Sequence, residues 1–520
     1  MTELMKRKPI IWTLSGSDCS GGAGIAADIK TGHALGVEVC HLITANTVQN
    51  STKLVAVNPV DVAILQQQVD LLNEDKTPTV IKIGLLANTV QVTWLVGVLA
   101  LFKAKSCRLK VIYDPVGQAS VGGKFSSLSV DDLTPLLALV DVITPNSIEA
   151  QMLANTTHVN SNKLAQVIQS LGVNSVIIKG GHSLTPEASD SPYCFDYCLH
   201  TLTDEDSSKM SQDDTIEYGL FSPKVDTYYS HGGGCSFATA LAAFIAHGHL
   251  VRDAFTLTKA FINQGLVANQ KKQDHYGAFE QTMWPTQPQY FPAISTRINK
   301  KHTELSAFKS IGIKREIDNP SAQKLGLYPV IDSLYWLERL LPLGLNIIQL
   351  RVKNKSGEEL SKIIKQAVIM SKPYNTRLFI NDYWQLAIEH GAYGVHIGQE
   401  DLQTTPLDII HQAGLRLGIS THGCYEFLFA QQLKPSYLAI GAIYPTKTKN
   451  MTGQIQGVEN LAHLLKLATD IPVVAIGGIN HERAPEVLAT SVDSIAVVTA
   501  ITEADNPEKA VEIFKQMMNN

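Results

Sequence analysis

Eight short apolar segments recur between residues 326 and 499, and stretches with helical periodicity separate them. Segments of this length and apolar content are typical of strands that are buried on both faces of a sheet. Strands that alternate with helices form parallel sheets. Eight such units predict a closed (β/α)8 TIM barrel, with its active site at the carboxyl ends of the strands. The expected strands are Gly326–Ile331, Asn346–Val352, Arg377–Asn381, Gly394–Ile397, Arg416–Ser420, Tyr437–Gly441, Val473–Gly477 and Ser494–Thr499.

The first half of the chain also alternates strand-like and helix-like patterns, which predicts a layered α/β domain. Residues 183–224 interrupt the alternation with Ser, Asp and Glu, and we expect a hairpin with a solvated tip there. We predict a first domain at 1–292, a linker with one short helix at 293–324, and the barrel at 325–520. The expected strands of the first domain are Ile10–Ser15, Lys110–Tyr113, Val140–Thr144 and Ser175–Lys179, and its expected helices include Val62–Leu72, Gln91–Phe102, Lys163–Leu171 and Cys235–His247.

Length and composition exclude several classes of function. A chain of 520 residues exceeds the size of a single hydrophobic core and should hold two or more domains. The formal net charge of −5 and the lack of a Lys/Arg-rich block argue against nucleic-acid binding. The longest apolar stretch, Trp94–Phe102, is far shorter than a membrane span of roughly 18 residues. Seven cysteines at scattered spacings indicate reduced thiols and a cytoplasmic location.

Two aspartates follow neighbouring strands of the predicted barrel. Asp382 comes directly after Arg377–Asn381, and Asp401 comes four residues after Gly394–Ile397. Consecutive parallel strands end at the same rim, so the two carboxylates should lie side by side and could hold a hard cation such as Mg²⁺. Alternatively, each aspartate begins the next loop or caps a helix.

A run of glycines, His231-Gly232-Gly233-Gly234-Cys235, leads directly into a clear helical pattern. Glycines at a helix start expose backbone N–H groups, and the helix dipole adds positive potential, which together suit a phosphoryl group. The same field should favour the thiolate of Cys235. The alternative is a glycine hinge before a packed helix with a buried cysteine.

Two further segments of the first half carry candidate chemistry. The small residues at 15–24 follow the first strand and would let a ligand approach the backbone, although their spacing does not match a dinucleotide fingerprint. Asn146 and Glu149 lie near a helix start and could face a hydrated Mg²⁺. The same spacing is also an ordinary helix-capping pattern.

Seven motifs of the first half, in order, are SGSDxSGGAGIxADIK, ITANTVQN, KIGLL, DPV, TPNxxEA, IKGGH and HGGGC. Over residues 10–277 they closely resemble hydroxymethylpyrimidine/phosphomethylpyrimidine kinases of the ribokinase superfamily. The resemblance implies a three-layer α/β fold and MgATP-dependent phosphorylation of hydroxymethylpyrimidine and its monophosphate. It implies that Gly16, Ala23 and Gln49 hold the pyrimidine with Asp28 nearby, that Asn146, Glu149 and Lys179 serve MgATP, that His231, Gly232, Gly233 and Gly234 form the anion hole, and that Cys235 is the general base.

The first half departs from this family's pattern at three places, one of which is the segment 227–230, where the family usually has Lys-Asn-Thr. Gly233 stands where the family has Thr, and residues 117–122 replace a segment that carries Met and Lys-Ser-Gly. The departures leave open a change in rate or in which of the two phosphorylations is performed. They also keep two alternatives open for this half: a pyridoxal-type kinase, and a degenerate domain that binds pyrimidine and regulates the second half.

The strand ends of the predicted barrel carry groups suited to anions. Arg351 and Lys353 follow the second strand on one face, together with Gln349, and could face a diphosphate. Hydroxyls and ammonium groups at 446–449 follow the sixth strand, and glycines end the seventh, where barrels commonly bind phosphate. Solvated strand-end charges and a polar loop are the alternatives, but one rim with two anion sites suggests two phosphorylated substrates.

The motifs QLRxK, FIND, GQED, GxSxH, PTxTK, AIGGI and VVTAI closely resemble thiamine-phosphate synthase, from Leu325 to Phe514. The resemblance implies condensation of a pyrimidine diphosphate with thiazole phosphate, with only small-molecule partners beyond a possible homodimer. It implies Mg²⁺ at Asp382 and Asp401, the pyrimidine diphosphate at Gln349, Arg351, Lys353, Asn381, Ser420 and Lys449, and the thiazole phosphate at Thr446, Thr448, Gly478, Val498 and Thr499.

Overall fold

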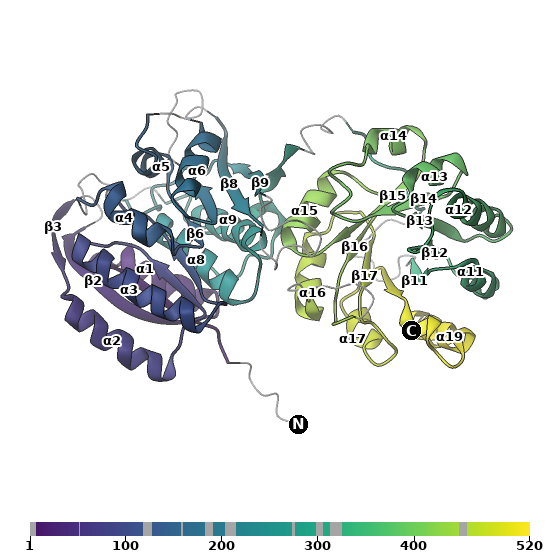
Figure 1. The fold of residues 1–520 in the computed structure, drawn as a ribbon, viewed down its shortest axis with the longest axis horizontal. Helices are drawn as coiled ribbons and strands as arrows, with labels where there is room; N and C mark the ends of the chain where they lie inside the picture. The colour runs from purple at the N-terminus through teal and green to yellow at the C-terminus, as the bar shows by residue number, and fades with distance from the viewer. Residues whose placement is uncertain are drawn as a thin grey trace. The chain divides into compact units, whose positions relative to one another are not determined.

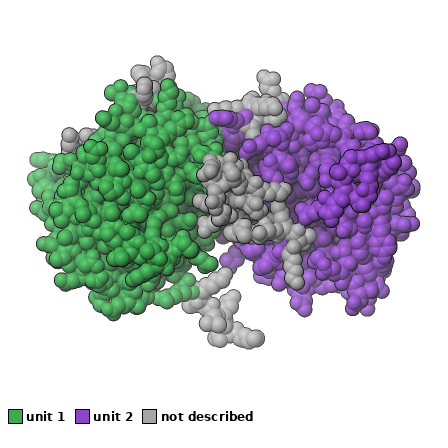
Figure 2. All heavy atoms as spheres, in the orientation of Figure 1, with its two compact units in different colours: residues 1–203, 211–295 green, residues 204–210, 296–520 purple. Residues whose placement is uncertain are grey.

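The computed structural model describes residues 7–50, 53–117, 127–157, 160–181, 191–202, 215–272, 276–297, 305–312, 325–446 and 455–519. Within these ranges, residues up to 295 form one compact unit and residues from 296 onward form a second (Figure 2). No described helix is long and apolar enough to cross a membrane.

The first unit is built on a ten-stranded sheet in the order β10-β9-β8-β7-β6-β5-β4-β1-β2-β3 (Figure 1). Six central strands run parallel, and β3, β8, β9 and β10 are antiparallel to their neighbours. Helices cover both faces, so the expected three-layer ribokinase-like domain is confirmed. The strands are β1 (Ile10–Ser17), β2 (Glu38–Gln49), β3 (Leu54–Pro59), β4 (Val80–Ile83), β5 (Lys110–Tyr113), β6 (Val142–Ile143), β7 (Ser175–Ile178), β8 (Tyr193–Thr201), β9 (Thr215–Pro223) and β10 (Ala293–Ser295).

Alternation along the strands separates an apolar face from a more polar one. Trp12 and Leu14 belong to a large apolar core together with Ile81 and Ile83, whereas the intervening Lys82 is fully buried against Asp28 of α1. The polar groups therefore gather on the face that α1 and α8 cover. The helices are α1 (Gly24–Ala34), α2 (Val62–Asp75), α3 (Thr89–Lys105), α4 (Val130–Leu137), α5 (Ser147–Leu153), α6 (Ser161–Ser170), α8 (Gly233–Ala246), α9 (Val251–Ala268) and the 3-10 turn η1 (Pro288–Tyr290).

The hairpin predicted at 183–224 is present in the described residues, whereas the linker predicted at 293–324 begins later than expected. β8 and β9 pair antiparallel as the hairpin that we expect there, and its tip lies outside the described residues. Residues 293–295 were expected to open the linker, but they pair with β9 as an edge strand, so the boundary falls after Ser295.

The second unit is a closed barrel of eight parallel strands, which confirms the predicted TIM barrel. All eight predicted strands are present, because buried parallel strands give continuous apolar runs that stand out in the sequence. The strands are β11 (Gly326–Ile331), β12 (Ile347–Leu350), β13 (Arg377–Asn381), β14 (Gly394–Ile397), β15 (Arg416–Thr421), β16 (Tyr437–Ile440), β17 (Val473–Ile476) and β18 (Ser494–Val497). The helices are α11 (Leu334–Leu340), η2 (Leu341–Leu343), α12 (Gly357–Ser371), α13 (Trp384–Glu389), α14 (Leu407–Gln412), α15 (Cys424–Gln432), α16 (Gly457–Leu467), α17 (Ala484–Leu488), α18 (Thr499–Thr502) and α19 (Pro507–Asn519).

Residues 305–312, which were expected to be linker, pack against the amino-terminal end of the barrel. Ile311 is 1% exposed in the barrel core, and its carbonyl accepts a 2.8 Å hydrogen bond from Arg377 Nε at the start of β13. The backbone N–H of Phe308 donates to Lys434 O over 3.0 Å. This part of the expected linker is therefore a structural part of the second unit.

Candidate active sites

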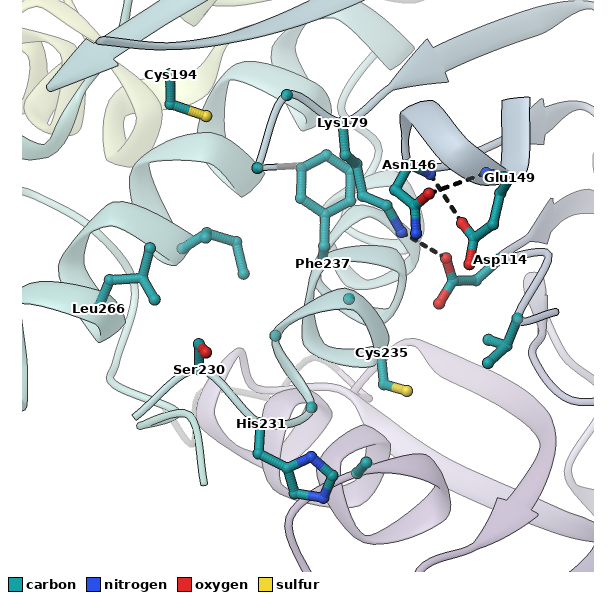
Figure 3. A pocket seen from close by; sticks show the side chains of 18 of the residues that line it. Asp114, Asn146, Glu149, Lys179, Cys194, Ser230, His231, Cys235, Phe237 and Leu266 are labelled. Atoms are coloured by element: carbon teal, nitrogen blue, oxygen red, sulfur yellow. Dashed lines mark hydrogen bonds and ion pairs between the residues drawn. The ribbon is translucent and has the colours of Figure 1, made fainter. Parts of the chain in front are cut away.

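A cavity of about 680 Å³ lies in the first unit, where the parallel strands end and α8 begins (Figure 3). The glycine-rich stretch after β1 forms one side, and the start of α8 forms another. Asn146, Glu149 and Lys179 line the cavity, as do Gly16, Ala23 and Gln49, so both predicted groups of kinase residues share one space.

The close approach of two backbone segments explains why glycines stand at these positions of the site. Gly232 caps α8 with φ +81°, and a Cβ there would lie 1.9 Å from the Gly22 carbonyl oxygen. A Cβ on Gly24 would lie 2.1 Å from Gly16 O, and one on Gly22 would lie 2.3 Å from the His231 ring. The two glycine-rich segments thus pack directly on each other, as no larger residues could.

A hydrogen bond between side chains ties these two segments together. His231 Nε2 lies 2.9 Å from Asp18 Oδ2. Burial opposes ionisation of Asp18, but hydrogen bonds from His231, Ser20 and Ala23 outweigh it and hold the pKa of the carboxyl well below its usual range. The pair therefore fixes the floor of the cavity.

Cys235 lies on the first turn of α8, beside the cavity (Figure 3). Burial raises its pKa to about 11, and the nearby Asp28 and Asp114 carboxylates act in the same direction, while Lys82 opposes them. The direction of this shift is opposite to the one expected from the helix start, and desolvation is its largest cause.

Lys179 and Asp114 form an ion pair with Nζ–Oδ1 2.7 Å at the opposite wall. Next to it, Asn146 and Glu149 make the capping box of α5, with Asn146 Oδ1 accepting from two backbone N–H groups and Glu149 Oε2 accepting from Asn146 N over 2.8 Å. Burial raises the pKa of Glu149 to about 7, with Asp114 adding to the effect and Lys179 opposing it. The capping alternative is thus realised, yet the same side chains face the cavity.

Asp28 is the one predicted pyrimidine residue that does not line the cavity. Its carboxylate is fully buried, accepting from Lys82 Nζ over 2.9 and 3.0 Å and from Thr239 Oγ1 over 2.7 Å. It joins β4 to α1 and α8, and so supports the wall rather than facing a ligand.

The barrel places its candidate groups at the carboxyl ends of adjacent strands. Asp382 follows β13 with φ +65°, and its backbone N–H donates to His396 O of β14 over 2.9 Å. Asp401 lies in the turn after β14, where its N–H donates to Gly398 O over 3.3 Å. The two aspartates therefore follow neighbouring parallel strands, as predicted.

The other barrel candidates occupy the same rim. Gln349 and Asn381 are 4% and 8% exposed on β12 and β13, Arg351 and Lys353 follow β12, and Ser420 lies on β15. Thr446, Gly478, Val498 and Thr499 follow β16, β17 and β18. Thr448 and Lys449 lie outside the described residues.

Two family models match the chain in succession. Residues 18–280 match the phosphomethylpyrimidine kinase model, and residues 327–501 match the thiamine monophosphate synthase model. The chain belongs to both families. It thus joins a phosphomethylpyrimidine kinase domain to a thiamine-phosphate synthase domain, two enzymes of thiamine biosynthesis, and the resemblance drawn from the motifs is confirmed for both halves.

Individual relatives are similar to one half each. Thiamine-phosphate synthase from Yersinia pseudotuberculosis is 56% identical over 188 residues, which are 36% of this chain and 87% of that protein. The structure of phosphomethylpyrimidine kinase from Clostridium difficile is 26% identical with a TM-score of 0.39, over 49% of this chain and 99% of that one. A pyridoxal kinase from Staphylococcus aureus is also 26% identical, with a TM-score of 0.43, over 53% of this chain and 94% of that one.

The kinase domain contains polar groups that we did not predict as site residues. Asp114 follows β5 in the Asp-Pro-Val motif, which was the available signal, and is 2% exposed beside Lys179. Lys259 of α9 lies 2.7 Å from Asp196 and 3.2 Å from Cys194 Sγ, and all three line the cavity. Cys194 and Asp196 lie together on β8, but Lys259 comes from the distant α9, so no local pattern points to this contact.

The metal expected in each domain has suitable donors but few of them. The described residues hold no cluster of three or more His, Cys, Asp or Glu side chains placed for a metal. Mg²⁺ commonly binds through one or two carboxylates with water and substrate phosphates completing its shell. Glu149 in the kinase domain, and Asp382 with Asp401 in the synthase domain, fit that mode.

Proposed function

We propose that the kinase domain uses MgATP to phosphorylate 4-amino-5-hydroxymethyl-2-methylpyrimidine and then its monophosphate. The synthase domain then condenses the diphosphate with 4-methyl-5-(2-phosphoethyl)thiazole and releases pyrophosphate. The observation that carries the proposal is the single cavity in which the α8 start faces the Lys179–Asp114 pair. Cytoplasmic location and homodimer formation stay predictions.

In the kinase domain, the backbone N–H groups at the start of α8 would stabilise charge on the transferred phosphoryl group. Lys179 would neutralise the ATP phosphates, and Asn146 and Glu149 would hold the hydrated Mg²⁺ that screens those phosphates. Gly16, Ala23 and Gln49 would bind the pyrimidine, because the small side chains leave room for a flat ring beside β1.

The raised pKa of Glu149 predicts a pH dependence for MgATP binding. Below its pKa of about 7 the carboxyl is protonated and binds the hydrated cation poorly, so affinity should rise with pH. We expect the KM for MgATP to fall about tenfold between pH 6 and pH 8, following the ionised fraction. Steady-state kinetics would measure this. Glu149→Gln, which cannot ionise, is the control and should show a flat profile apart from the titration of ATP itself.

The raised pKa of the Cys235 thiol predicts a second pH dependence, that of the kinase rate. With a pKa of about 11, only a small thiolate fraction exists at neutral pH, and it grows about tenfold with each pH unit. If Cys235 is the general base, kcat/KM for the pyrimidine alcohol should rise with unit slope between pH 7 and pH 9. Cys235→Ala should lose about 10²- to 10⁴-fold and the slope, whereas Cys235→Asp should keep a base and flatten the slope. An alanine variant with wild-type kinetics would rule out this role.

In the synthase domain, Arg351, Lys353 and Lys449 would bind the diphosphate and stabilise the departing pyrophosphate, with Gln349, Asn381 and Ser420 on the pyrimidine side. Asp382 and Asp401 would hold Mg²⁺, which supplies further charge neutralisation at the leaving group. Thr446, Thr448, Gly478, Val498 and Thr499 would bind the thiazole phosphate, whose ring nitrogen attacks the pyrimidine methylene. This reaction depends mainly on orientation of the two substrates, which suits a rim with two anion sites.

One assay tests the whole proposal. The chain is supplied with the pyrimidine alcohol, thiazole phosphate and MgATP, and thiamine phosphate is measured by HPLC. Formation of thiamine phosphate that depends on added ATP is the expected result. Turnover of pyridoxal but not of the pyrimidine alcohol would favour a pyridoxal-type kinase. Condensation of supplied diphosphate without any ATP turnover would favour a pyrimidine-binding regulatory domain.

A further inference from the structure

Five polar side chains from five different strands form a hydrogen-bonded chain inside the barrel. Gln349 Nε2 lies 3.1 Å from Tyr328 Oη, which lies 2.7 Å from Tyr437 Oη. Tyr437 Oη lies 2.7 Å from His396 Nδ1, and His396 Nε2 lies 2.8 Å from Ser420 Oγ. Both ends of the chain are residues that we assign to the pyrimidine diphosphate site, whereas its middle has no role in the proposed reaction.

The middle of this chain is closed off from solvent. Tyr328 is 1% exposed, Tyr437 is fully buried, and His396 is 6% exposed and stacks on the Tyr437 ring at 5.6 Å. Burial raises the pKa of both phenols above their usual range, so each keeps one hydrogen to donate.

The partners of Tyr328 set the direction of the whole chain. Among the described residues, Gln349 Nε2 donates to the Tyr328 hydroxyl, and either phenol could donate in the contact between Tyr328 and Tyr437. Only donation from Tyr328 to Tyr437 gives the Tyr328 hydrogen one of these acceptors, and it leaves the Tyr437 hydrogen for His396. Tyr437 then donates to His396 Nδ1, which must accept. The neutral imidazole therefore carries its hydrogen on Nε2 and donates it to Ser420 Oγ.

A serine oxygen that already accepts from a histidine has its own hydrogen available for another acceptor. The backbone at Ser420 is also held, because Gln399 Nε2 donates to Ser420 O over 2.7 Å. Both the position and the polarity of this hydroxyl are thus fixed before a ligand arrives, and a ring nitrogen or a phosphate oxygen is the kind of atom that it suits.

We propose that His396, Tyr437 and Tyr328 are positioning residues that hold Ser420 as a hydrogen-bond donor toward the pyrimidine diphosphate. The inference rests on the proposed synthase function for its kinetic consequence. The direction of the hydrogen bonds between Gln349 and Ser420 does not depend on that function.

Two substitutions of His396 test the roles of its two ring nitrogens separately. The amide of His396→Gln can reach the position of Nε2 and donate to Ser420, whereas that of His396→Asn lies near Nδ1, where it can contact Tyr437 but cannot reach Ser420. We expect the Asn variant to lose about 10- to 100-fold in synthase kcat with a KM for thiazole phosphate within about twofold of wild type, and the Gln variant to stay within about threefold. Equal losses in both variants would overturn the proposal, as would full activity of His396→Asn. Thermal melting followed by circular dichroism checks that both variants fold.

The direction of the hydrogen bonds between Gln349 and Ser420 has a test of its own, which needs no turnover. The ¹⁵N shifts of the imidazole nitrogens distinguish the two tautomers in the full chain, with His396→Gln identifying the signal. We expect the Nε2–H form in the wild type and a mixture in Tyr437→Phe, which keeps the ring and removes the donor to Nδ1. A wild-type Nδ1–H form would overturn the proposal. If the wild type showed the Nε2–H form but no condensation, the proposed synthase function would fail while the direction of the chain stood.

Discussion

The Asp401→Ala chain should lose at least about a thousandfold of its condensation rate while it phosphorylates the pyrimidine alcohol at the wild-type rate. Asp401 and Asp382 follow neighbouring strands of the barrel, and removing one carboxylate would remove half of the protein's donors to Mg²⁺. The pyrophosphate would then depart with less charge neutralisation. HPLC of thiamine phosphate from supplied diphosphate measures the loss, and ATP turnover in the same preparation measures the kinase.

A matched control for this change lies on α14, seven residues after Asp401. Asp408 is an exposed carboxylate at the start of that helix, and Asp408→Ala should leave both activities unchanged. Raising the Mg²⁺ concentration should recover part of the activity in Asp401→Asn, which keeps an oxygen donor, and none in Asp401→Ala. If both activities fell together in Asp401→Ala without unfolding, the division of labour between the two domains would be wrong.

The second large effect is expected at the start of α8. In Gly232→Ala, the new Cβ would lie 1.9 Å from Gly22 O, and the residue would keep a left-handed backbone with φ +81°. One of the two glycine segments must move, which displaces the N–H groups from the phosphoryl position. We expect kinase turnover to fall at least about a hundredfold, since a shift of about 1 Å in a positioning group has that effect.

Gly233→Ala provides the comparison, because a Cβ there meets nothing within 4 Å. It adds the same methyl group to the same helix turn and should retain most of the kinase rate. Thermal melts of both variants, with the synthase rate as an internal standard, separate local displacement from unfolding. Equal kinase rates in the two variants would show that the fit of Gly232 against Gly22 does not position the anion site.

The sequence was sufficient to predict those structural elements whose residue pattern lies within one short segment. The barrel strands are continuous apolar runs because they are buried on both faces, and the eight of them recur with helices between, so their number alone indicates closure. The glycines of the α8 start were visible because they follow one another in one short segment, although the fit of Gly232 against Gly22 depends on a distant partner. In contrast, the strand at 293–295 and the packing of Ile311 gave no periodic pattern, because each depends on a distant partner.

The sequence by itself determined both folds and both families, and it predicted the residues of the two candidate sites. Only the tertiary structure decided the state of the groups within them. Burial raises the pKa of the Cys235 thiol, and Asp28 faces Lys82 rather than the cavity. The polarity that we propose for Ser420 follows from Gln349 through residues on three other strands. Desolvation and hydrogen-bond direction depend on neighbours brought together by folding, so no single segment can encode them.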